Sequence, residues 1–264
     1  MLNSKMTPMR TVTRTLAMQF TWIAYLVLVA AFFPHIASLV LLSIYAVGIL
    51  LAVLMARLFS RFLVKGADTP FVMELPPYRV PTAKSVFRHT WEKGRQYLQK
   101  MSGIILICSM AIWFLGYFPN HNAYDSVKEQ QEHSFIGYIG KAMEPVLEPL
   151  GFDWRMGVGI VSGVGAKELV VSTLGVMYSD DVPEAVEGDA GTTRLQRALT
   201  GSVTPAAALA YMVFILLYFP CVATFVAIKN ESGRWKWAII TAIYTILLAW
   251  VAAFITFRLA SLFM

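Results

Sequence analysis

Five long apolar stretches restrict this sequence to a small set of folds. Each is about 18 to 29 residues long, which meets the roughly 20 residues that a helix needs to cross a bilayer. They cover approximately Leu16–Phe33, Ile36–Leu63, Met101–Phe118, Pro205–Ile228 and Trp235–Phe263. Inside a bilayer every backbone amide needs a hydrogen-bond partner within the protein, so such stretches form helices. The sequence therefore predicts an all-α, polytopic membrane protein with about five spanning helices.

Composition and charge exclude a soluble domain and a nucleic-acid binder. The 264 residues are 57% hydrophobic and 14% charged, which is more apolar than a soluble domain of this length can bury. The net charge of +6 sits in loops beside the apolar stretches, as orientation signals do, and not in patches interleaved with aromatic residues. The basic segment 57–100 is then cytoplasmic and the acidic loop 120–153 is external. Cys108 and Cys221 fall in different apolar stretches, so no disulfide framework is expected.

A sixth apolar segment, Trp154–Tyr178, differs from the other five. It contains five glycines, among them Gly163 and Gly165, and Lys167 next to Glu168 at its centre. Glycines permit sharp bends and close helix contacts, and an intramembrane charge costs several kcal/mol unless it is paired or hydrated. We expect a broken or re-entrant helical hairpin that lines a cavity. The alternative is an ordinary spanning helix whose two charges neutralise charges on neighbouring helices.

Charges in the later loops favour the re-entrant hairpin. Acidic residues crowd 180–189, and basic residues gather at 229–236. If 154–178 crossed the bilayer, the acidic loop would be cytoplasmic and the basic loop external, against the positive-inside rule. If the chain turns back near Gly163–Glu168, both loops fall on their expected sides.

A proline and a cysteine stand together inside the stretch that begins at Pro205. Pro220 cannot donate a hydrogen bond to the Leu216 carbonyl, so we expect a helix break there, which a bilayer tolerates only beside protein or a water-filled cavity. Cys221 adds a soft thiol next to the break, a combination suited to a path for a soft or borderline cation. The alternative is that Cys221 is a small buried residue beside a harmless kink.

The segment between the second and third stretches combines a Pro-rich motif with a basic one. Three prolines in six residues, at positions 76, 77 and 81, forbid a helix there. Thr82 or Ser85 can cap the amphipathic, basic segment Val86–Gln99, which we expect to lie as a helix on the cytoplasmic membrane surface. A docking face for a soluble domain is the alternative for this segment.

Three long motifs follow one another in a fixed order. They are FVMELPPYRVP at Phe71–Pro81, GFDWRMGVGIVSGVGAKELVVSTLGVMY at Gly151–Tyr178 and LYFPCVATFVAIKNESGRWKW at Leu217–Trp237. Together they resemble the bacterial ferrous iron transport protein B family, over roughly Val27–Phe257. In that family a cytoplasmic GTPase domain precedes two membrane gate domains, which are similar to nucleoside-transporter repeats. This sequence lacks the phosphate loop G-x-x-x-x-G-K-[ST] and the first gate, as one half of a split transporter or a truncated product would.

The resemblance implies a division of the chain and roles for single residues. The implied parts are an N-terminal segment with two linking transmembrane helices (1–65), the cytoplasmic motif with its amphipathic helix (66–100) and a gate-type membrane domain (101–264). Cys221 matches the gate cysteine and is the first candidate ligand for Fe²⁺. Glu168 is the second, and Lys167 compensates its charge in the metal-free state. Helix breaks and gating are expected at Pro220, Gly163, Gly165 and Lys167, and a cytoplasmic motif at Glu74, Pro76, Pro77 and Arg79, in which Glu74 caps or pairs helices.

The resemblance also implies a function, which is ferrous iron transport by a multi-pass gate portion of a GTPase-coupled transporter in the bacterial inner membrane. Fe²⁺ is then the cargo, no cofactor is bound tightly, and GTP hydrolysis belongs to a separate portion that also carries the first gate. Homo-oligomerisation is left open. The alternatives are an orphan gate domain acting as an assembly or regulatory subunit and a nucleoside-like small-molecule binder. Intramembrane proteolysis is disfavoured, because position 160, two residues before Ser162, is Ile instead of the glycine of a Gly-x-Ser-Gly loop, and no apolar stretch contains a histidine to activate the serine.

Overall fold

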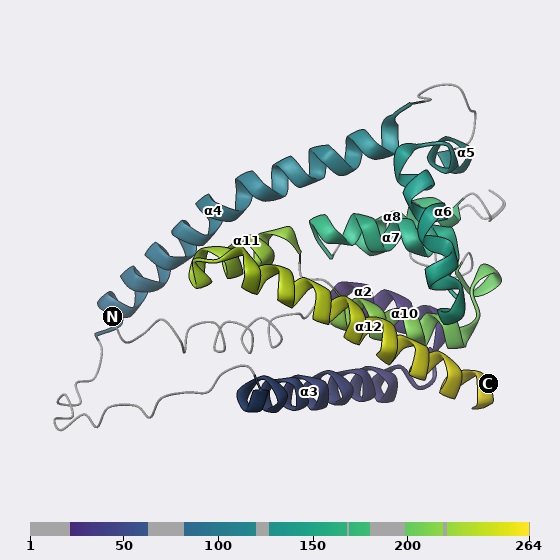
Figure 1. Ribbon diagram of the computed structural model, residues 1–264, viewed down its shortest axis with the longest axis horizontal. Helices are drawn as coiled ribbons and strands as arrows, with labels where there is room; N and C mark the ends of the chain where they lie inside the picture. Colours follow the sequence, from purple (N-terminus) through teal and green to yellow (C-terminus); the bar gives the residue numbers. More distant parts are fainter. Residues whose placement is uncertain are drawn as a thin grey trace.

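The chain is all-helical in the computed structural model (Figure 1), as the apolar stretches predicted. The structure describes residues 22–62, 82–119, 127–167, 169–179, 199–218 and 221–263, and no strand occurs among them. The labelled helices are α2 (Trp22–Phe32), α3 (Ala37–Phe62), α4 (Ala83–Tyr117), α5 (Val127–Glu132), α6 (Phe135–Leu147), η1 (Glu148–Leu150), α7 (Trp154–Gly165), α8 (Leu169–Ser179), α10 (Pro205–Leu217), α11 (Val222–Ser232) and α12 (Trp235–Phe263).

Helix α10 forms the centre of the core. Nearly every residue from Ala206 to Tyr218 is buried, so this helix is apolar on all sides, as is typical of a helix enclosed by others. It packs most extensively on α12, where Ala249 and Ala253 are fully buried. Small side chains such as these let two helix backbones approach closely. Helices α2 and α3 contact α10 as well, so its C-terminal end lies within the protein.

Helices α7 and α8 form an antiparallel hairpin. The facing pairs are Gly159 with Leu174 and, nearer the turn, Gly163 with Val170. At the open end the Tyr178 hydroxyl donates a hydrogen bond to the Asp153 carboxylate, with 2.9 Å between the oxygens. Asp153 also caps α7, because its side chain accepts from the backbone amide of Met156. The chain therefore folds back after Gly165, as the loop charges predicted, and does not continue as one helix.

Helices α10 and α11 are two halves of an interrupted helix. α10 ends at Leu217 and α11 begins at Val222, with extended backbone at Tyr218 (ψ 179°) and Cys221 (ψ 154°). The long helix α12 contacts both halves and runs back along them (Figure 1). The interruption falls where the sequence predicted a break, between Leu217 and Val222, and the role of Pro220 stays a prediction because this residue lies outside the described residues.

Helix α4 corrects one prediction from the sequence. The amphipathic helix expected at Val86–Gln99 and the apolar stretch expected to start at Met101 are parts of one continuous helix of 35 residues. No proline or turn signal separates them, so the change from polar to apolar side chains does not interrupt the backbone. Thr82 occupies the N-cap position, as proposed, but its side chain makes no capping hydrogen bond.

Two of the described helices are long and apolar enough to cross a membrane. They are found at Ala37–Leu58 in α3 and Trp235–Leu262 in α12, and shorter apolar segments occur at Leu106–Tyr117, Leu169–Tyr178 and Pro205–Leu217. Both long helices expose many large apolar side chains, such as Leu42 and Leu262. A surface of this kind is typical of helices that lipid or another protein covers.

Candidate functional site

The two helix breaks meet inside the protein. Lys167 lies in the turn between α7 and α8, and its Nζ donates a hydrogen bond of 3.0 Å to the backbone carbonyl of Ile215 in the last turn of α10. The same ammonium lies 5.0 Å from the centroid of the Tyr218 ring. Only 7% of the Lys167 surface is exposed. The turn of one broken segment thus places a buried cation at the end of the other.

The position of Lys167 follows from the way α10 ends. The last carbonyls of a helix have no donor four residues further on, and they form the negative end of the helix dipole. A cation at that end satisfies a carbonyl and is stabilised by the dipole. The sequence predicted a freed carbonyl at Leu216, and the structure shows the lysine on the adjacent carbonyl, that of Ile215. The predicted compensation of Glu168 by Lys167 stays a prediction, because Glu168 lies outside the described residues.

Glycines in α7 make room for tyrosines of α10. An ideal Cβ atom on Gly159 would lie 2.6 Å from the Tyr211 hydroxyl, and one on Gly163 would collide with the Tyr218 hydroxyl. Tyr211 donates a hydrogen bond of 3.2 Å to the Met156 carbonyl on α7. Both glycines stand inside α7, so they leave room for the two tyrosine side chains and do not form the turn itself.

Gly165, the last residue of α7, faces α4. A Cβ atom there would lie 2.6 Å from Ile112 Cδ1 and 3.7 Å from Cys108 Cβ. The glycine therefore allows the turn of the hairpin to rest directly on α4. Gating at Gly163 and Gly165 remains a prediction, and the structure adds a close-packing role for each.

Cys221 occupies the N-cap position of α11, and its side chain makes no capping hydrogen bond to the backbone. It is half-buried, and its Sγ lies 3.3 Å from the hydroxyl of Thr224, with either atom as the donor. Its carbonyl accepts the amide of Thr224. The thiol thus lies at the start of α11, on one side of the interruption. Lys167 contacts the last turn of α10 on the other side.

The described residues contain no group of three or more His, Cys, Asp or Glu side chains that could hold a metal ion. Glu168 and Pro220 lie outside the described ranges, as do Glu74, Pro76, Pro77 and Arg79 of the cytoplasmic motif. Within the described residues, the two sides of the interruption carry the Cys221 thiol and the Ile215 carbonyl, whose atoms are of kinds that can bind a cation. One thiol with backbone carbonyls suits passage of a cation better than tight storage.

A pocket of about 280 Å³ opens beside the hairpin, between α4, α5, α6, α7 and α8. One wall carries the rings of Trp113 and Tyr117, stacked with centroids 4.8 Å apart. Ser162 of α7, which is buried, and Thr173 of α8 also line the pocket, and both carry hydroxyl groups. The pocket is therefore neutral and mixes aromatic faces with hydroxyl and amide groups.

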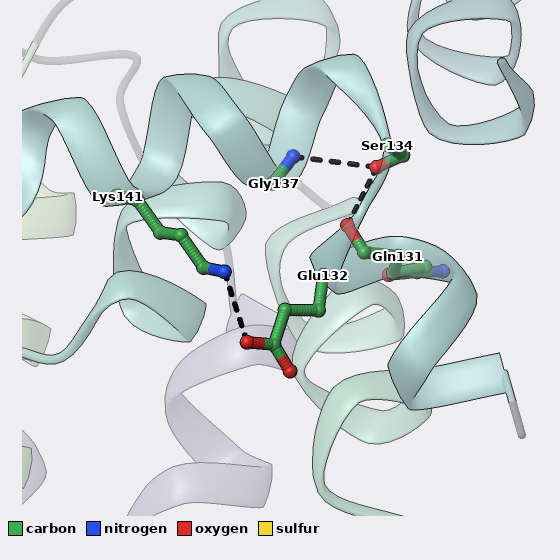
Figure 2. A network of polar contacts seen from close by, with 5 residues as sticks. All are labelled: Gln131, Glu132, Ser134, Gly137 and Lys141. Carbon is green, nitrogen blue, oxygen red and sulfur yellow. Dashed lines mark hydrogen bonds and ion pairs between the residues drawn. The ribbon is translucent and has the colours of Figure 1, made fainter. Parts of the chain in front are cut away.

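The junction of α5 and α6 positions the pocket wall that carries Gln131 (Figure 2). Ser134 Oγ donates a hydrogen bond of 2.6 Å to the Gln131 carbonyl and accepts one from the amide of Gly137, which caps α6. Lys141 Nζ donates to Glu132 Oε1 at 2.9 Å, so α6 is tied back to the end of α5. No side chain larger than glycine fits at position 137, because its Cβ would meet the backbone of the α5 end.

The sequence did not reveal Ile215, Tyr211 and Tyr218 as partners of the hairpin. The sequence does contain a regular spacing of these residues. Gly159 and Gly163 are four residues apart in α7, and their partners Tyr211 and Tyr218 are seven residues apart. Both spacings place residues on one face of a helix.

An interrupted helix whose break meets the turn of a helical hairpin is a feature of membrane transporters. The family model described as "Nucleoside recognition", named Gate, matches residues 98–235, which is more than half of the chain. The model described as "Ferrous iron transport protein B C terminus" matches residues 41–93. The chain belongs to the ferrous iron transport protein B family, and it corresponds to the C-terminal portion with a gate domain.

Similar curated proteins are iron transporters. An Fe(2+) transport protein A/Fe(2+) transporter FeoB fusion protein of Porphyromonas gingivalis is 48% identical over 90% of this chain and 32% of its own length. Fe(2+) transporters FeoB of Staphylococcus aureus and Campylobacter jejuni are 36% and 34% identical, over 90% of this chain and 34% and 39% of theirs. The chain thus spans about a third of the length of these relatives. No solved structure matches it.

Proposed function

We propose that the chain is the C-terminal gate portion of a GTPase-coupled ferrous iron transporter of the bacterial inner membrane, and that Fe²⁺ passes at the meeting point of the two helix breaks. The observation that carries this proposal is the buried contact of Lys167 with the Ile215 carbonyl. Interrupted helices in transporters offer carbonyls and helix ends to ions at the middle of the membrane. A buried ammonium such as that of Lys167 costs desolvation energy, so it does not stabilise a protein core as well as an apolar side chain of similar size.

The arrangement of the helices supports a crossing of the membrane with a re-entrant hairpin. In Figure 1 the start of α4 and the α11 end of α12 lie toward one side, whereas α5, α6 and the C-terminus lie toward the other. The first side carries the basic residues near 229–236, which the positive-inside rule assigns to the cytoplasm. The hydrogen bond from Tyr178 to Asp153 holds both outer ends of the hairpin together, so the loops before and after it leave from one side.

The chemistry of the cargo fits the groups at the breaks. Fe²⁺ accepts thiolate, carboxylate and carbonyl ligands, and a transported ion has to be held weakly enough to leave again. Cys221 is the first proposed ligand and Glu168 the second. Pro220, Gly163 and Gly165 are the proposed gating positions beside Lys167, and Fe²⁺ is cargo and not a resident cofactor.

The coverage of the relatives supports a partner. Because the chain spans about a third of each Fe(2+) transporter FeoB that it matches, we place the GTPase and the first gate in the remaining two thirds. Hydrolysis of GTP is then not a property of this chain, and self-association of the chain is an open part of the proposal.

Uptake of ferrous iron by cells that lack their own ferrous transporter tests this proposal. The chain alone, the GTPase-bearing portion alone and both together are compared under reducing conditions. We expect uptake above background only when both are present. Equal background uptake in all three strains, with both proteins present in the membrane, would contradict a transport role and favour an assembly or regulatory subunit.

One observation favours a second candidate function, that of a small-molecule binder. The neutral pocket beside the hairpin has stacked aromatic rings and hydroxyl groups, which suit a planar, uncharged ligand with hydrogen-bonding edges. A shift in the melting temperature of the purified chain with uridine or adenosine, abolished by Trp113→Ala, would support this role. The absence of any shift at millimolar nucleoside would remove it.

A further inference from the structure

The ammonium of Lys167 occupies a position that suits a cation on several sides. Its Nζ lies 3.0 Å from the Ile215 carbonyl oxygen and 5.0 Å from the centre of the Tyr218 ring. The end of α10 adds the negative pole of a helix dipole. Carbonyl oxygens, an aromatic face and a negative helix end stabilise any cation, and an ammonium is only one example.

We propose that the end of α10 is a cation-binding site on the transport path, and that Lys167 fills it as a tethered occupant while no metal is present. The exchangeable ligand is a divalent metal cation such as Fe²⁺. That the site lies on a path rests on the proposed function, whereas the existence of the site does not. Two cations this close repel each other strongly, so a metal ion that enters has to displace the lysine.

The surroundings of Lys167 fit an occupant that can leave. Lys167 lies in the short turn between α7 and α8, after Ala166, which has extended backbone. Because Lys167 belongs to neither helix, its side chain can leave the site without unfolding a helix. An apolar residue at position 167 would fill the same volume without the desolvation cost of a buried charge. The presence of a charge therefore indicates a site where positive charge is used.

The melting temperature of the purified chain in detergent tests the site without any need for transport. Lys167→Ala removes three methylene groups and the ammonium, and n-propylammonium supplies the same atoms. Mn²⁺ serves as an air-stable divalent probe. We expect both probes to raise the melting temperature of Lys167→Ala by at least about 2 °C and to shift the wild type less, because its lysine competes for the site.

Lys141→Ala is the matched control. It also removes one lysine, but that lysine forms a half-exposed ion pair that joins α6 to Glu132 at the end of α5 (Figure 2). Neither probe should shift this variant. If Lys167→Ala does not fold, Lys167→Gln keeps a hydrogen-bond donor of similar length without the charge, and Mn²⁺ should raise its melting temperature.

Each outcome decides the proposal. A shift with n-propylammonium alone would mean that the position serves only to cap α10 with an ammonium, and it would overturn the metal site. Equal shifts in the wild type and the variant, or no shift with either probe in both position-167 variants, would also overturn it. Melting shifts without iron uptake would support the cation site and contradict the transport function. Iron uptake without melting shifts would support the transport function and contradict the cation site.

Discussion

The hydroxyl of Tyr218 lies in the space that a Cβ atom on Gly163 would occupy. The same relationship joins Gly159 and Tyr211, so two glycines of α7 receive two tyrosines of α10. The two tyrosine side chains reach from α10 and its C-cap to α7, and the turn of the hairpin meets the end of α10 where Lys167 contacts the Ile215 carbonyl. The site therefore depends on glycine at positions 159 and 163, because a larger residue there would collide with the tyrosines.

Gly163→Ala should lower the free energy of unfolding by about 1 to 3 kcal/mol, because the added methyl collides with the Tyr218 hydroxyl and the Val170 side chain in a packed core. The second change Tyr218→Phe, which removes the hydroxyl that the methyl meets, should restore part of the loss. Unfolding in detergent, followed by circular dichroism, measures both.

Gly94→Ala is the control for the glycine substitution. Gly94 stands in α4 with no atom within 4 Å of its Cβ position. Alanine there should be neutral or stabilising by about 0.5 to 1 kcal/mol, because it stiffens the unfolded chain and favours helix. Equal losses at Gly94 and Gly163 would show that the contact with Tyr218 does not limit packing.

The sequence predicted the two interruptions because each has a local chemical cause. Pro220 cannot donate a backbone hydrogen bond, and the acidic and basic loops on either side of the last apolar stretches agree only with a chain that turns back between α7 and α8. The all-α class follows equally directly from the apolar stretches. These features depend on single residues or on charge counts, which a sequence displays.

The sequence did not predict the continuity of α4 or the partner of Lys167. Near Gln99–Gly103 the side chains along the sequence change from polar to apolar. That change predicts an element boundary, although no residue there breaks a helix. Lys167 and Ile215 are 48 residues apart, and their contact depends on how α7 packs on α10. Tertiary pairing of this kind has no local signal.

Cys221→Ser should reduce the initial rate of ferrous uptake by about tenfold or more while the protein remains folded, because a hydroxyl is a poorer ligand for a borderline cation than a thiol. Cys108→Ser is the control, since Cys108 lies on α4 beside the hairpin turn and not at the break. Uptake with reduced iron in the complete transporter measures both. Unchanged uptake in Cys221→Ser would assign the thiol to packing.

Glu187→Cys should react with a membrane-impermeant thiol reagent from outside intact cells, in a background where Cys108 and Cys221 are serine. The reason is that a re-entrant 154–178 leaves the following loop external. Lys93→Cys on the exposed first half of α4 should react only after the membrane is opened. Labelling of Glu187→Cys in opened membranes alone would mean that the segment crosses the bilayer.

Tyr178→Phe should destabilise the chain by about 1 to 3 kcal/mol, because it removes the hydrogen bond that closes the open end of the hairpin onto the charged Asp153 carboxylate. Tyr138→Phe on the exposed face of α6 should change stability by less than about 0.5 kcal/mol. Chemical unfolding compares the two. Similar small effects would show that the Tyr178 hydrogen bond contributes little to holding the hairpin ends together.

Lys167→Met combined with Glu168→Gln separates a metal path from a structural ion pair. Either single change leaves one charge uncompensated at depth and should lower protein abundance. If Glu168 attracts Fe²⁺, the double variant should regain abundance while uptake stays low. Recovery of normal uptake together with abundance would remove Glu168 from the path.

Flux of Fe²⁺ into proteoliposomes that contain this chain and the GTPase-bearing portion is the most direct test of iron passage through the gate. An encapsulated iron-sensitive dye reports entry under reducing conditions, with GTP supplied to the GTPase side. We predict flux that requires both proteins and falls by about tenfold or more in Cys221→Ser. Flux that persists without this chain, or that is unchanged in Cys221→Ser combined with Glu168→Gln, would contradict it.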